Sequence, residues 1–428
     1  MPYRKWRSKV LMGVVGAACI FILYKKLMIP GKKLSALEKN VDSHPALAKS
    51  VEVAQQNPPV QLPVSSDVED MRQNALTMNF AQTITNLDQF GEHSDGAPIL
   101  VVQVHDRATF FAQLVNSLKN VKGIEQATLV ISMDQFSKEV DEVISSIDFC
   151  RYLKIFFPFS KQLYPNSFPG EDPNDCPRDL SKHDAIQRRC NNAEYPDMYG
   201  HYREVKFVQI KHHWLWKLHM LFSGIRAFKG STSVLLLEED YYVAPDLLHC
   251  LAKAVELKDV KCSRCQTISL GNYKEHQDYS LQGNHVEIKA WTSSAHNIGM
   301  VVTRGFYNQI VDCTDKICEY DDYNWDWSLQ AAASCIPGSL FTIAFNAARV
   351  FHIGTCGIHN HEDCHAAEAV KGVTAQLQNA QLFPETLHVA LDSAAVAPQP
   401  RPNGGWGDAR DHLLCKKYKT LCEKSAGL

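Results

Sequence analysis

The stretch Ser233-Val234-Leu235-Leu236-Leu237-Glu238-Glu239-Asp240 joins a short apolar run directly to three carboxylates. An apolar run of this length predicts a buried strand, and its acidic end then lies where open α/β sheets bind ligands. Neighbouring carboxylates repel one another unless a cation neutralises them. The stretch therefore predicts an α/β fold with a cation site at the end of this strand. Taken alone, it is also compatible with a solvated acidic loop after a strand.

Alternating strand and helix patterns precede this stretch. Apolar runs predict strands at residues 98–104, 128–131 and 152–157, with helical apolar spacing between them. A longer helix is expected around residues 211–228, directly before the acidic strand. This alternation predicts a mostly parallel sheet. The sequence has no Gly-x-Gly-x-x-Gly motif, which argues against an ordinary dinucleotide-binding enzyme.

The amino-terminal part of the chain has the pattern of a membrane anchor. Basic residues flank a short uncharged run, and no obvious small-residue cleavage site follows it. The pattern predicts a cytoplasmic tail over residues 1–9, a signal-anchor transmembrane segment over 10–29, a lumenal stem over 30–74 and one large domain over 75–428. A cleaved signal peptide is the alternative for the apolar run.

Charge and cysteine content narrow the class of protein. A formal net charge of -3 over 428 residues gives no electrostatic case for nucleic acid. Of the 14 cysteines, all except Cys19 lie from Cys150 onward. Such density is typical of an oxidising compartment, so the large domain is expected on the lumenal side of a type II membrane protein.

Several long segments together resemble one family of enzymes. They include Val-Val-Gln-Val-His-Asp-Arg at 101–107, Tyr-Asp-Asp-Tyr-Asn-Trp-Asp-Trp at 320–327, Asn-Gly-Gly-Trp-Gly-Asp at 403–408, and segments at 156–160, 194–197, 200–204 and 209–214. Over roughly residues 75–415 the chain resembles the N-acetylglucosaminyltransferase II family of glycosyltransferases. The resemblance implies a Rossmann-like α/β domain of the GT-A type behind the anchor and stem, in the Golgi membrane.

The resemblance also implies the reaction and the partners. N-acetylglucosamine is transferred from UDP-GlcNAc to the 2-hydroxyl of the mannose on the α1,6 arm of an N-glycan, as hybrid glycans mature to complex ones. The expected partners are UDP-GlcNAc, the N-glycan of a glycoprotein and the membrane, with Mn²⁺ as cofactor. A homodimer is left open, and nucleic acid is not expected.

This reaction needs a general base, which the matching motif places at Asp326. Inversion at the anomeric carbon requires one in-line displacement, in which a base activates the hydroxyl and a metal stabilises the departing diphosphate. Trp325 and Trp327 are expected to form an apolar wall that raises the basicity of the carboxylate or stacks on a sugar. By chemistry alone Asp321 and Asp322 are rival bases. Asp326 is alternatively the cap of a helix that begins near Trp327.

The resemblance implies two protein ligands for the metal, Asp240 and His352. Together with two diphosphate oxygens and water they would complete an octahedral ion such as Mn²⁺, which accepts carboxylate and imidazole. Glu238 and Glu239 are then expected to contact the ribose or to support the ligands. Without the resemblance, a lone histidine after an apolar strand is more often a core residue.

The resemblance further implies a set of residues that bind the donor. They are Gln103, Val104, His105, Asp106, Arg107, Asp134, Gln209, Ile210, Lys211, His212 and His213. The first five end a predicted strand, where a turn brings backbone amides and Arg107 to the uracil and phosphates. Trp214 and Trp216 are expected to pack in the core.

The family pattern implies five disulfides, which spacing alone cannot select. The pairs are Cys176–Cys190, Cys262–Cys265, Cys313–Cys335, Cys318–Cys415 and Cys356–Cys364. Cys150, Cys250 and Cys422 are left as free thiols or, for Cys422, an intermolecular link. Zinc is disfavoured at Cys262 and Cys265, because no second Cys-x-x-Cys exists to complete the site. It is disfavoured at residues 356–365 because the family pattern pairs the two cysteines of that segment.

Two alternative functions stay open at the level of the sequence. A noncatalytic, membrane-tethered glycan-binding ectodomain would keep the fold without turnover, although Asp240, Asp326 and His352 are all present. A related transferase with another acceptor, such as N-acetylglucosaminyltransferase I, would keep them as well, because pocket shape sets acceptor choice.

Overall fold

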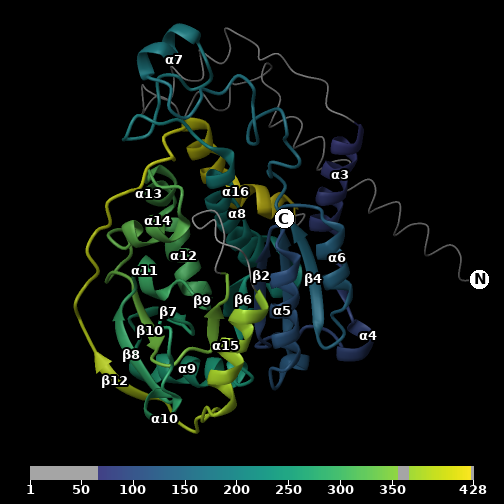
Figure 1. Cartoon of the computed structure of the whole chain (residues 1–428), viewed down its shortest axis with the longest axis vertical. Coiled ribbons are helices and arrows are strands. Elements are labelled where there is room, and N and C mark those ends of the chain that lie inside the picture. Colours follow the sequence, from purple (N-terminus) through teal and green to yellow (C-terminus); the bar gives the residue numbers. More distant parts are fainter. Residues whose placement is uncertain (1–65, 355–365, 426–428) are drawn as a thin grey trace, which may run out of the picture.

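The structure is a computed structural model that describes residues 66–354 and 366–425 (Figure 1). The predicted tail, anchor and most of the predicted stem lie outside these ranges. Among the described residues, no helix combines the length and the apolar character that a membrane crossing requires.

Helix α3 (Ser66–Ala81) extends the folded part into the predicted stem. It packs on strand β4 (Arg151–Phe156), where the side-chain amide of Asn79 accepts from the N–H of Phe156 at 2.8 Å and donates to its C=O at 2.7 Å. This amide takes the place of a neighbouring strand. Helix α3 thus spans the end of the predicted stem and the start of the predicted domain, and it packs against that domain. The sequence of α3 is too polar and irregular to have indicated this.

A ten-stranded mixed sheet forms the centre of the domain, in the order β1-β4-β3-β2-β5-β9-β7-β10-β8-β12. Its other strands are β1 (Ile84–Thr85), β2 (Ile99–Val104), β3 (Thr128–Met133), β5 (Ser233–Glu238), β7 (Cys265–Ser269), β8 (His285–Ala290), β9 (Met300–Thr303), β10 (Phe341–Phe345) and β12 (His388–Asp392). Strands β4, β3, β2 and β5 are parallel, as predicted. The second half is mixed and departs from the prediction in part: β9 is antiparallel to β5 and β7, and β10 to β8, whereas the pairs β10–β7 and β12–β8 are parallel. A short apolar run carries no signal for strand direction, which depends on the connections.

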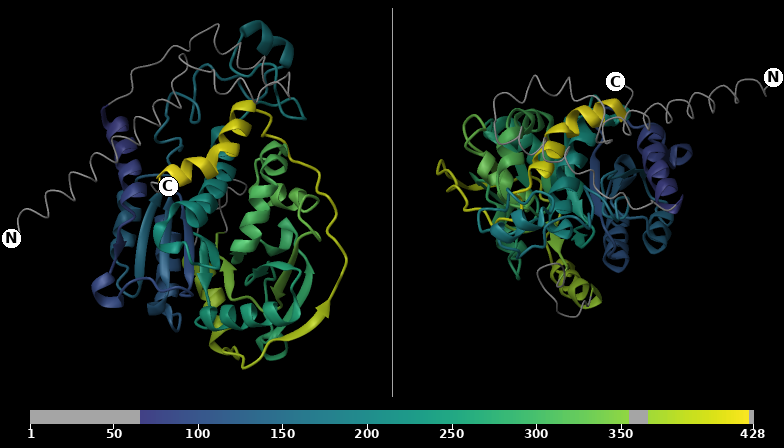
Figure 2. Two further views of the ribbon diagram at one scale, coloured as in Figure 1. Left: turned by 180° about the vertical axis from the view of Figure 1, so that it is seen from behind. Right: turned by 90° about the horizontal axis from the view of Figure 1, so that it is seen from above.

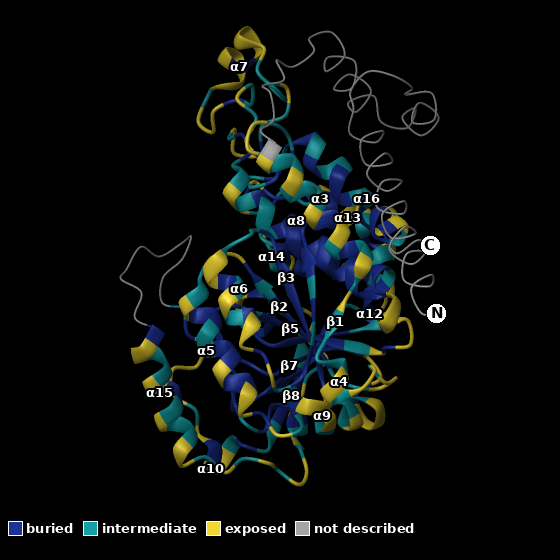
Figure 3. Cartoon of the chain, turned by 90° about the vertical axis from the view of Figure 1, so that its right-hand side faces the viewer, coloured by how far each residue is buried: buried dark blue, intermediate teal, exposed yellow. Residues whose placement is uncertain are grey.

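Helices cover both faces of this sheet (Figures 1 and 3). The helices that matter below are α5 (Ala108–Lys119), α6 (Lys138–Ser145), α8 (Val205–His219), α9 (Leu247–Lys261), α12 (Arg304–Asp312), α13 (Thr314–Glu319), α14 (Trp325–Ala332), α15 (Ala366–Gln378) and α16 (Ala409–Ser425). Alternate residues of β2 point to opposite faces: Leu100 and Val102 pack with α5, α6 and α9, whereas Ile99 and Val101 pack with α8, α12, α14 and α16. The long helix predicted over 211–228 instead begins at Val205 and gives way to a π turn at Met220–Gly224.

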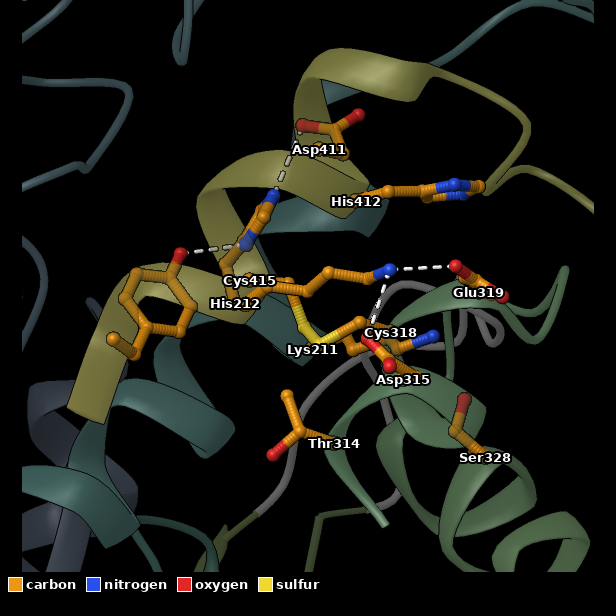
Figure 4. Close-up of a disulfide and its surroundings, with 12 residues drawn as sticks. Lys211, His212, Thr314, Asp315, Cys318, Glu319, Ser328, Asp411, His412 and Cys415 are labelled. Carbon is orange, nitrogen blue, oxygen red and sulfur yellow. Dashed lines mark hydrogen bonds and ion pairs between the residues drawn. A yellow bond between two sulfur atoms is a disulfide. The ribbon is translucent and has the colours of Figure 1, made fainter. Parts of the chain in front are cut away.

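Four of the five predicted disulfides are present, and the fifth, Cys356–Cys364, lies outside the described residues. Cys318–Cys415 joins α13 to α16 (Figure 4), and the rear view shows α16 lying along α8 (Figure 2). Cys150, Cys250 and Cys422 are free and buried. The burial of Cys422 removes the expectation of an intermolecular link there.

Candidate active site

The carboxyl ends of three neighbouring parallel strands bring polar side chains to one place. Gln103 of β2 lies in register between Ser132 of β3 and Glu238 of β5. Each lies two residues after an apolar residue that packs toward α8, so all three face α8. The site predicted at the end of the acidic strand is thus at an edge shared by three strands.

The acidic cluster beyond β5 is held by the turn that follows β2. Glu239 accepts from the backbone N–H of His105 at 2.7 Å and from Arg107 Nε at 3.2 Å. Arg107 also donates to Asp240 Oδ2. Burial raises the pKa of Glu239 to about 7, although the His105 N–H and the Arg107 charge favour its ionised form. Arg107 therefore already neutralises part of this cluster.

Asp240 and His352 meet because a second, two-stranded sheet joins them. Strand β6 (Tyr241–Val243) pairs with β11 (Val350–His352), with His352 opposite Tyr241. His352 Nε2 lies 3.1 Å from Asp240 Oδ2. Burial alone would raise the pKa of Asp240, but the hydrogen bond with His352 and the charge of Arg107 outweigh it and lower that pKa.

The donor set at this point suits a divalent cation. Asp240 is 2% exposed, and its Oδ1 has no hydrogen-bond partner among the described residues, which is costly for a buried carboxylate oxygen. Adjacent ligands on an octahedral ion, with bonds of about 2.1 Å, lie about 3 Å apart, close to the separation of the Asp240 and His352 atoms. Among the described residues, no group of three or more His, Cys, Asp or Glu side chains is arranged to hold a metal. Any cation here would need further ligands from elsewhere.

Asp134, just past β3, is the centre of a second cluster. His105 Nδ1 lies 2.6 Å from Asp134 Oδ1, Gln209 donates to Oδ2 at 2.8 Å, and His213 Nδ1 lies 3.4 Å from Oδ2. Burial alone would lower the pKa of His105, but Asp134 outweighs it and raises that pKa to about 9. His105 and Asp134 thus form an ion pair. His213 Nε2 also contacts Ser132 Oγ at 2.8 Å.

The structure does not bring every predicted donor residue to these clusters. Lys211 is fully buried, and its Nζ donates to the C=O groups of Tyr320 and Asp322 at 3.1 and 3.0 Å. His212 instead faces Asp411 of α16 at 2.9 Å. The reason is helical geometry: in a continuous helical segment only every third or fourth residue shares a face.

Two further predicted donor residues have apolar roles, and one is exposed. The side chain of Val104 lies in the core, and Ile210 is partly buried against the cluster on the α8 face. Asp106 has a side chain that is 53% exposed, 3.7 Å from His105 Nε2.

Asp326 lies in the first turn of α14, next to the acidic cluster. Its Oδ2 accepts from Asn297 Nδ2 at 3.0 Å and its Oδ1 from the N–H of Trp327 at 2.9 Å. Burial raises the pKa of Asp326 to about 7, the Trp327 N–H opposes this, and the charge of Glu238 adds to it. The residue before the helix is Asn324, so Asp326 is not the cap of a helix that begins at Trp327.

The two rival carboxylates hold loops together. Asp322 is fully buried and accepts four hydrogen bonds, two from Asn324 and two from Asn403. Asp321 accepts the N–H groups of Met198 and Trp406. The charges that act on the pKa of Asp321 come from Asp197 and His412, away from the acidic cluster. Among the three carboxylates of this motif, Asp326 is therefore the one whose pKa is raised by the charge of Glu238.

The two tryptophans beside Asp326 have different surroundings. Trp325 is buried and stacks on Trp214, with ring centroids 4.2 Å apart, so it belongs to the core. Trp327 lines a cavity of about 710 Å³, together with Tyr199, Arg401 and Asn403. Aromatic and hydrogen-bonding side chains of this kind suit a polar ligand with an apolar face.

Two site residues were missed by reasoning from the sequence. Asn297 precedes Asp326 by 29 residues, and no pattern in the sequence links the two. Lys217 of α8 is 1% exposed and donates from Nζ to Gln103 Oε1 at 2.8 Å. Its spacing of four residues from His213 was a usable signal.

Comparison with known proteins places these features in context. The chain matches the model of a family described as N-acetylglucosaminyltransferase II over residues 72–415. It is 41% identical to an alpha-1,6-mannosyl-glycoprotein 2-beta-N-acetylglucosaminyltransferase of Rattus norvegicus, over 98% of this chain and 100% of that protein. A protein of the same name from Arabidopsis thaliana is 30% identical, over 80% of this chain and 79% of that protein. The crystal structure of S. aureus TarS 1-349 is similar with a TM-score of 0.32 at 9% identity over 66% of each chain, which is too distant to carry an argument.

Proposed function

Because this chain belongs to the N-acetylglucosaminyltransferase II family, we propose that it transfers N-acetylglucosamine from UDP-GlcNAc to the 2-hydroxyl of the α1,6-arm mannose of an N-glycan. The proposal includes inversion at the anomeric carbon, the GT-A class for the domain and residence in the Golgi membrane. The observation that carries it is the position of Asp326 beside the acidic cluster that ends β5.

In the proposed reaction Asp326 is the general base. It takes the proton of the acceptor hydroxyl while the hydroxyl oxygen forms a bond to the anomeric carbon and the bond to the diphosphate breaks, releasing UDP. A pKa of about 7 suits this step, because about half of the base is then ionised at neutral pH and the carboxylate is more basic than an ordinary one. Asn297 and the Trp327 N–H hold the carboxylate in one orientation.

The donor is proposed to lie between the Asp134 cluster and the acidic cluster. Asp134, His105, Gln209 and His213 offer charged and polar groups for the nucleoside, and Arg107 offers a cation for the phosphates. Asp240 and His352 are proposed to hold Mn²⁺, which would supply charge stabilisation for the leaving diphosphate. The unpartnered Asp240 Oδ1 supports this assignment.

The acceptor is proposed to occupy the cavity lined by Trp327 and Tyr199. Its aromatic faces suit sugar rings, and it adjoins the residue next to Asp326. This position would bring the acceptor hydroxyl to the base.

The test is an assay of the purified full-length chain with UDP-GlcNAc, Mn²⁺ and a panel of defined N-glycans. We expect a β-linked product on the α1,6-arm mannose, and no turnover in excess EDTA or in Asp240→Asn. Asp326→Asn should lose roughly two to four orders of magnitude in rate while it still binds UDP-GlcNAc in calorimetry. Glycan binding without turnover would support the noncatalytic alternative, and transfer to the α1,3 arm would indicate the related transferase.

A further inference from the structure

One face of helix α8 forms a polar stripe against the ends of the central strands. Gln209, His213 and Lys217 are spaced four residues apart and so share this face. Their contacts advance from strand to strand: Gln209 to Asp134, His213 to Ser132, and Lys217 to Gln103. The first two contacts belong to the proposed donor site. The third contact, between Lys217 and Gln103, is the next one along the stripe.

Lys217 is in a costly position for a cation. Its side chain is 1% exposed, and its Nζ donates to the side-chain amide of Gln103, which carries no charge. Burial lowers the pKa of Lys217 to about 7, while the charge of Glu238 opposes this. A buried amine with one amide acceptor contributes little to stability, because taking the charge out of water offsets the hydrogen bond.

The partner of Lys217 holds the strand end on which the donor site is built. The C=O of Gln103 accepts from the N–H of Glu239 at 3.1 Å, and its side chain accepts from Lys217. Gln103 leads directly into the turn whose His105 N–H and Arg107 side chain hold the acidic cluster. A displacement of Gln103 would therefore displace both donors of this turn.

We propose that Lys217 is a positioning residue for the donor site, which acts through the side chain of Gln103 to fix the carboxyl end of β2. This inference rests on the proposed function for the identity of the donor. It does not depend on the metal, because the contact that carries it joins α8 to β2.

The experiment is a double-mutant cycle on the full-length chain. Lys217→Met keeps the length of the side chain and removes the donor, and Gln103→Leu removes the acceptor. The readouts are KM for UDP-GlcNAc, KM for the glycan, kcat, and the Kd of UDP with Mn²⁺ from calorimetry. Lys217→Met should weaken UDP and UDP-GlcNAc binding roughly tenfold, as expected for loss of a hydrogen bond to a charged group. The glycan KM should change less than twofold.

The double variant separates the proposed route from a general packing effect. If Lys217 acts through Gln103, Lys217→Met adds almost nothing in the Gln103→Leu background. His219→Leu is the matched control, because His219 is a buried polar residue of α8 whose Nδ1 contacts the hydroxyl of Tyr307 instead. It should lower the melting temperature and leave the Kd for UDP close to that of the parent.

Three results would overturn the inference. They are a Kd for UDP within twofold of the parent in Lys217→Met, independent effects of the two substitutions, and an equal loss of affinity in His219→Leu. If Lys217→Met does not fold, the Kd of Gln103→Leu for UDP decides the inference alone. A Kd equal to that of the parent would show that Gln103 does not position the donor site. A parent that binds UDP but transfers no N-acetylglucosamine would refute the proposed function, and the cycle on UDP affinity would still decide the role of Lys217.

Discussion

At the scale of single residues, the environment of Asp326 predicts how activity depends on pH. Burial raises its pKa to about 7 and the charges of Glu238 and Asp322 act in the same direction, while the Trp327 N–H opposes them. A base acts in its ionised form, so kcat/KM should fall as the pH drops below about 7 and level off above it. A pH profile of kcat/KM measures this directly. A flat profile between pH 6 and 8 would contradict the assignment.

Asn297 offers a variant that should move this profile. Its amide stabilises the ionised carboxylate, so Asn297→Leu should raise the apparent pKa. Tyr273 donates to Asn297 Oδ1 at 2.9 Å and fixes the amide, so Tyr273→Phe should shift the profile in the same direction by less.

The close packing around Gly354 predicts a loss of activity when this residue is replaced. A Cβ at this position would overlap Asp240 Oδ2 and crowd Arg107. Gly354→Ala should therefore reduce kcat/KM at least tenfold, because the proposed metal ligand has to move. Gly372→Ala is the control, since a Cβ there meets nothing within 4 Å and alanine favours helix α15 by roughly 0.5–1 kcal/mol. The kinetics and melting temperatures of both variants test this. Equal activity in the two variants would contradict it.

Residue-level reasoning from the sequence placed Asp240 correctly at the carboxyl end of a buried strand, because the apolar run that forms the strand leads directly to it. Its role as a metal ligand stays a prediction. His352 was not predictable from physics alone, because its approach to Asp240 depends on the pairing of β6 with β11. Asp326 could not be separated from Asp321 and Asp322, because their hydrogen-bond partners come from distant loops.

At the scale of elements, a buried ion cluster joins α8 to α16. Asp411 accepts from Arg203 at 2.8 and 3.0 Å and from His212 at 2.9 Å, and His212 Nδ1 accepts from the hydroxyl of Tyr418 (Figure 4 shows His212 and Asp411). Burial alone would raise the pKa of Asp411, but Arg203 and His212 outweigh it and lower that pKa. Asp411 thus stabilises the fold in its ionised form, at pH values above about 3.9.

Asp411→Asn should therefore lower the free energy of unfolding by up to about 3–5 kcal/mol at pH 7, because buried Arg203 loses its nearest carboxylate and keeps only Asp175 at 3.3 Å and Asp408 at 3.9 Å. The difference from the parent should shrink as the pH falls below about 4, because Asp411 then takes up a proton in the unfolded chain while it stays ionised in the folded protein, whose pKa is lowered. Urea unfolding at several pH values measures both effects. Asp315→Asn is the control: its carboxylate is 81% exposed and pairs with Lys416, so it should change stability by less than about 1 kcal/mol. A similar loss in both variants would show that burial is not the cause.

Elements were predicted best where one pattern repeats over their whole length. Strands β2, β3, β4 and β5 lie within a residue or two of their predicted bounds, because apolar residues dominate each of them. Helix α8 was placed late, because its first turn is only partly buried and a π turn prolongs its apolar pattern past His219. Strand β12 is mostly exposed and has no such pattern.

At the scale of the whole molecule, the Cys318–Cys415 bridge ties the carboxyl-terminal segment to the region of Asp326. It closes a loop with a sequence separation of 97, and Trp406 Nε1 donates to the C=O of Cys318 at 2.8 Å beside it. This topology was implied only by the family resemblance, since spacing cannot choose among so many pairings. The bridge should stabilise the fold through the chain entropy of the unfolded state, by about 4–5 kcal/mol if no strain opposes it.

Cys415→Ala should therefore lower the free energy of unfolding more than Cys190→Ala does. The Cys176–Cys190 bridge has a sequence separation of only 14. For a loop of that length, the loss of chain entropy in the unfolded state corresponds to about 3 kcal/mol. Cys415→Ala should also lower kcat, since the Trp406 segment holds Asp321 in the same motif as Asp326. Non-reducing peptide mapping checks the premise. Alkylation of Cys318 or Cys415 in the native protein would contradict the bridge, and an unchanged kcat in Cys415→Ala would show that the carboxyl-terminal segment is held at the active site by its hydrogen bonds alone.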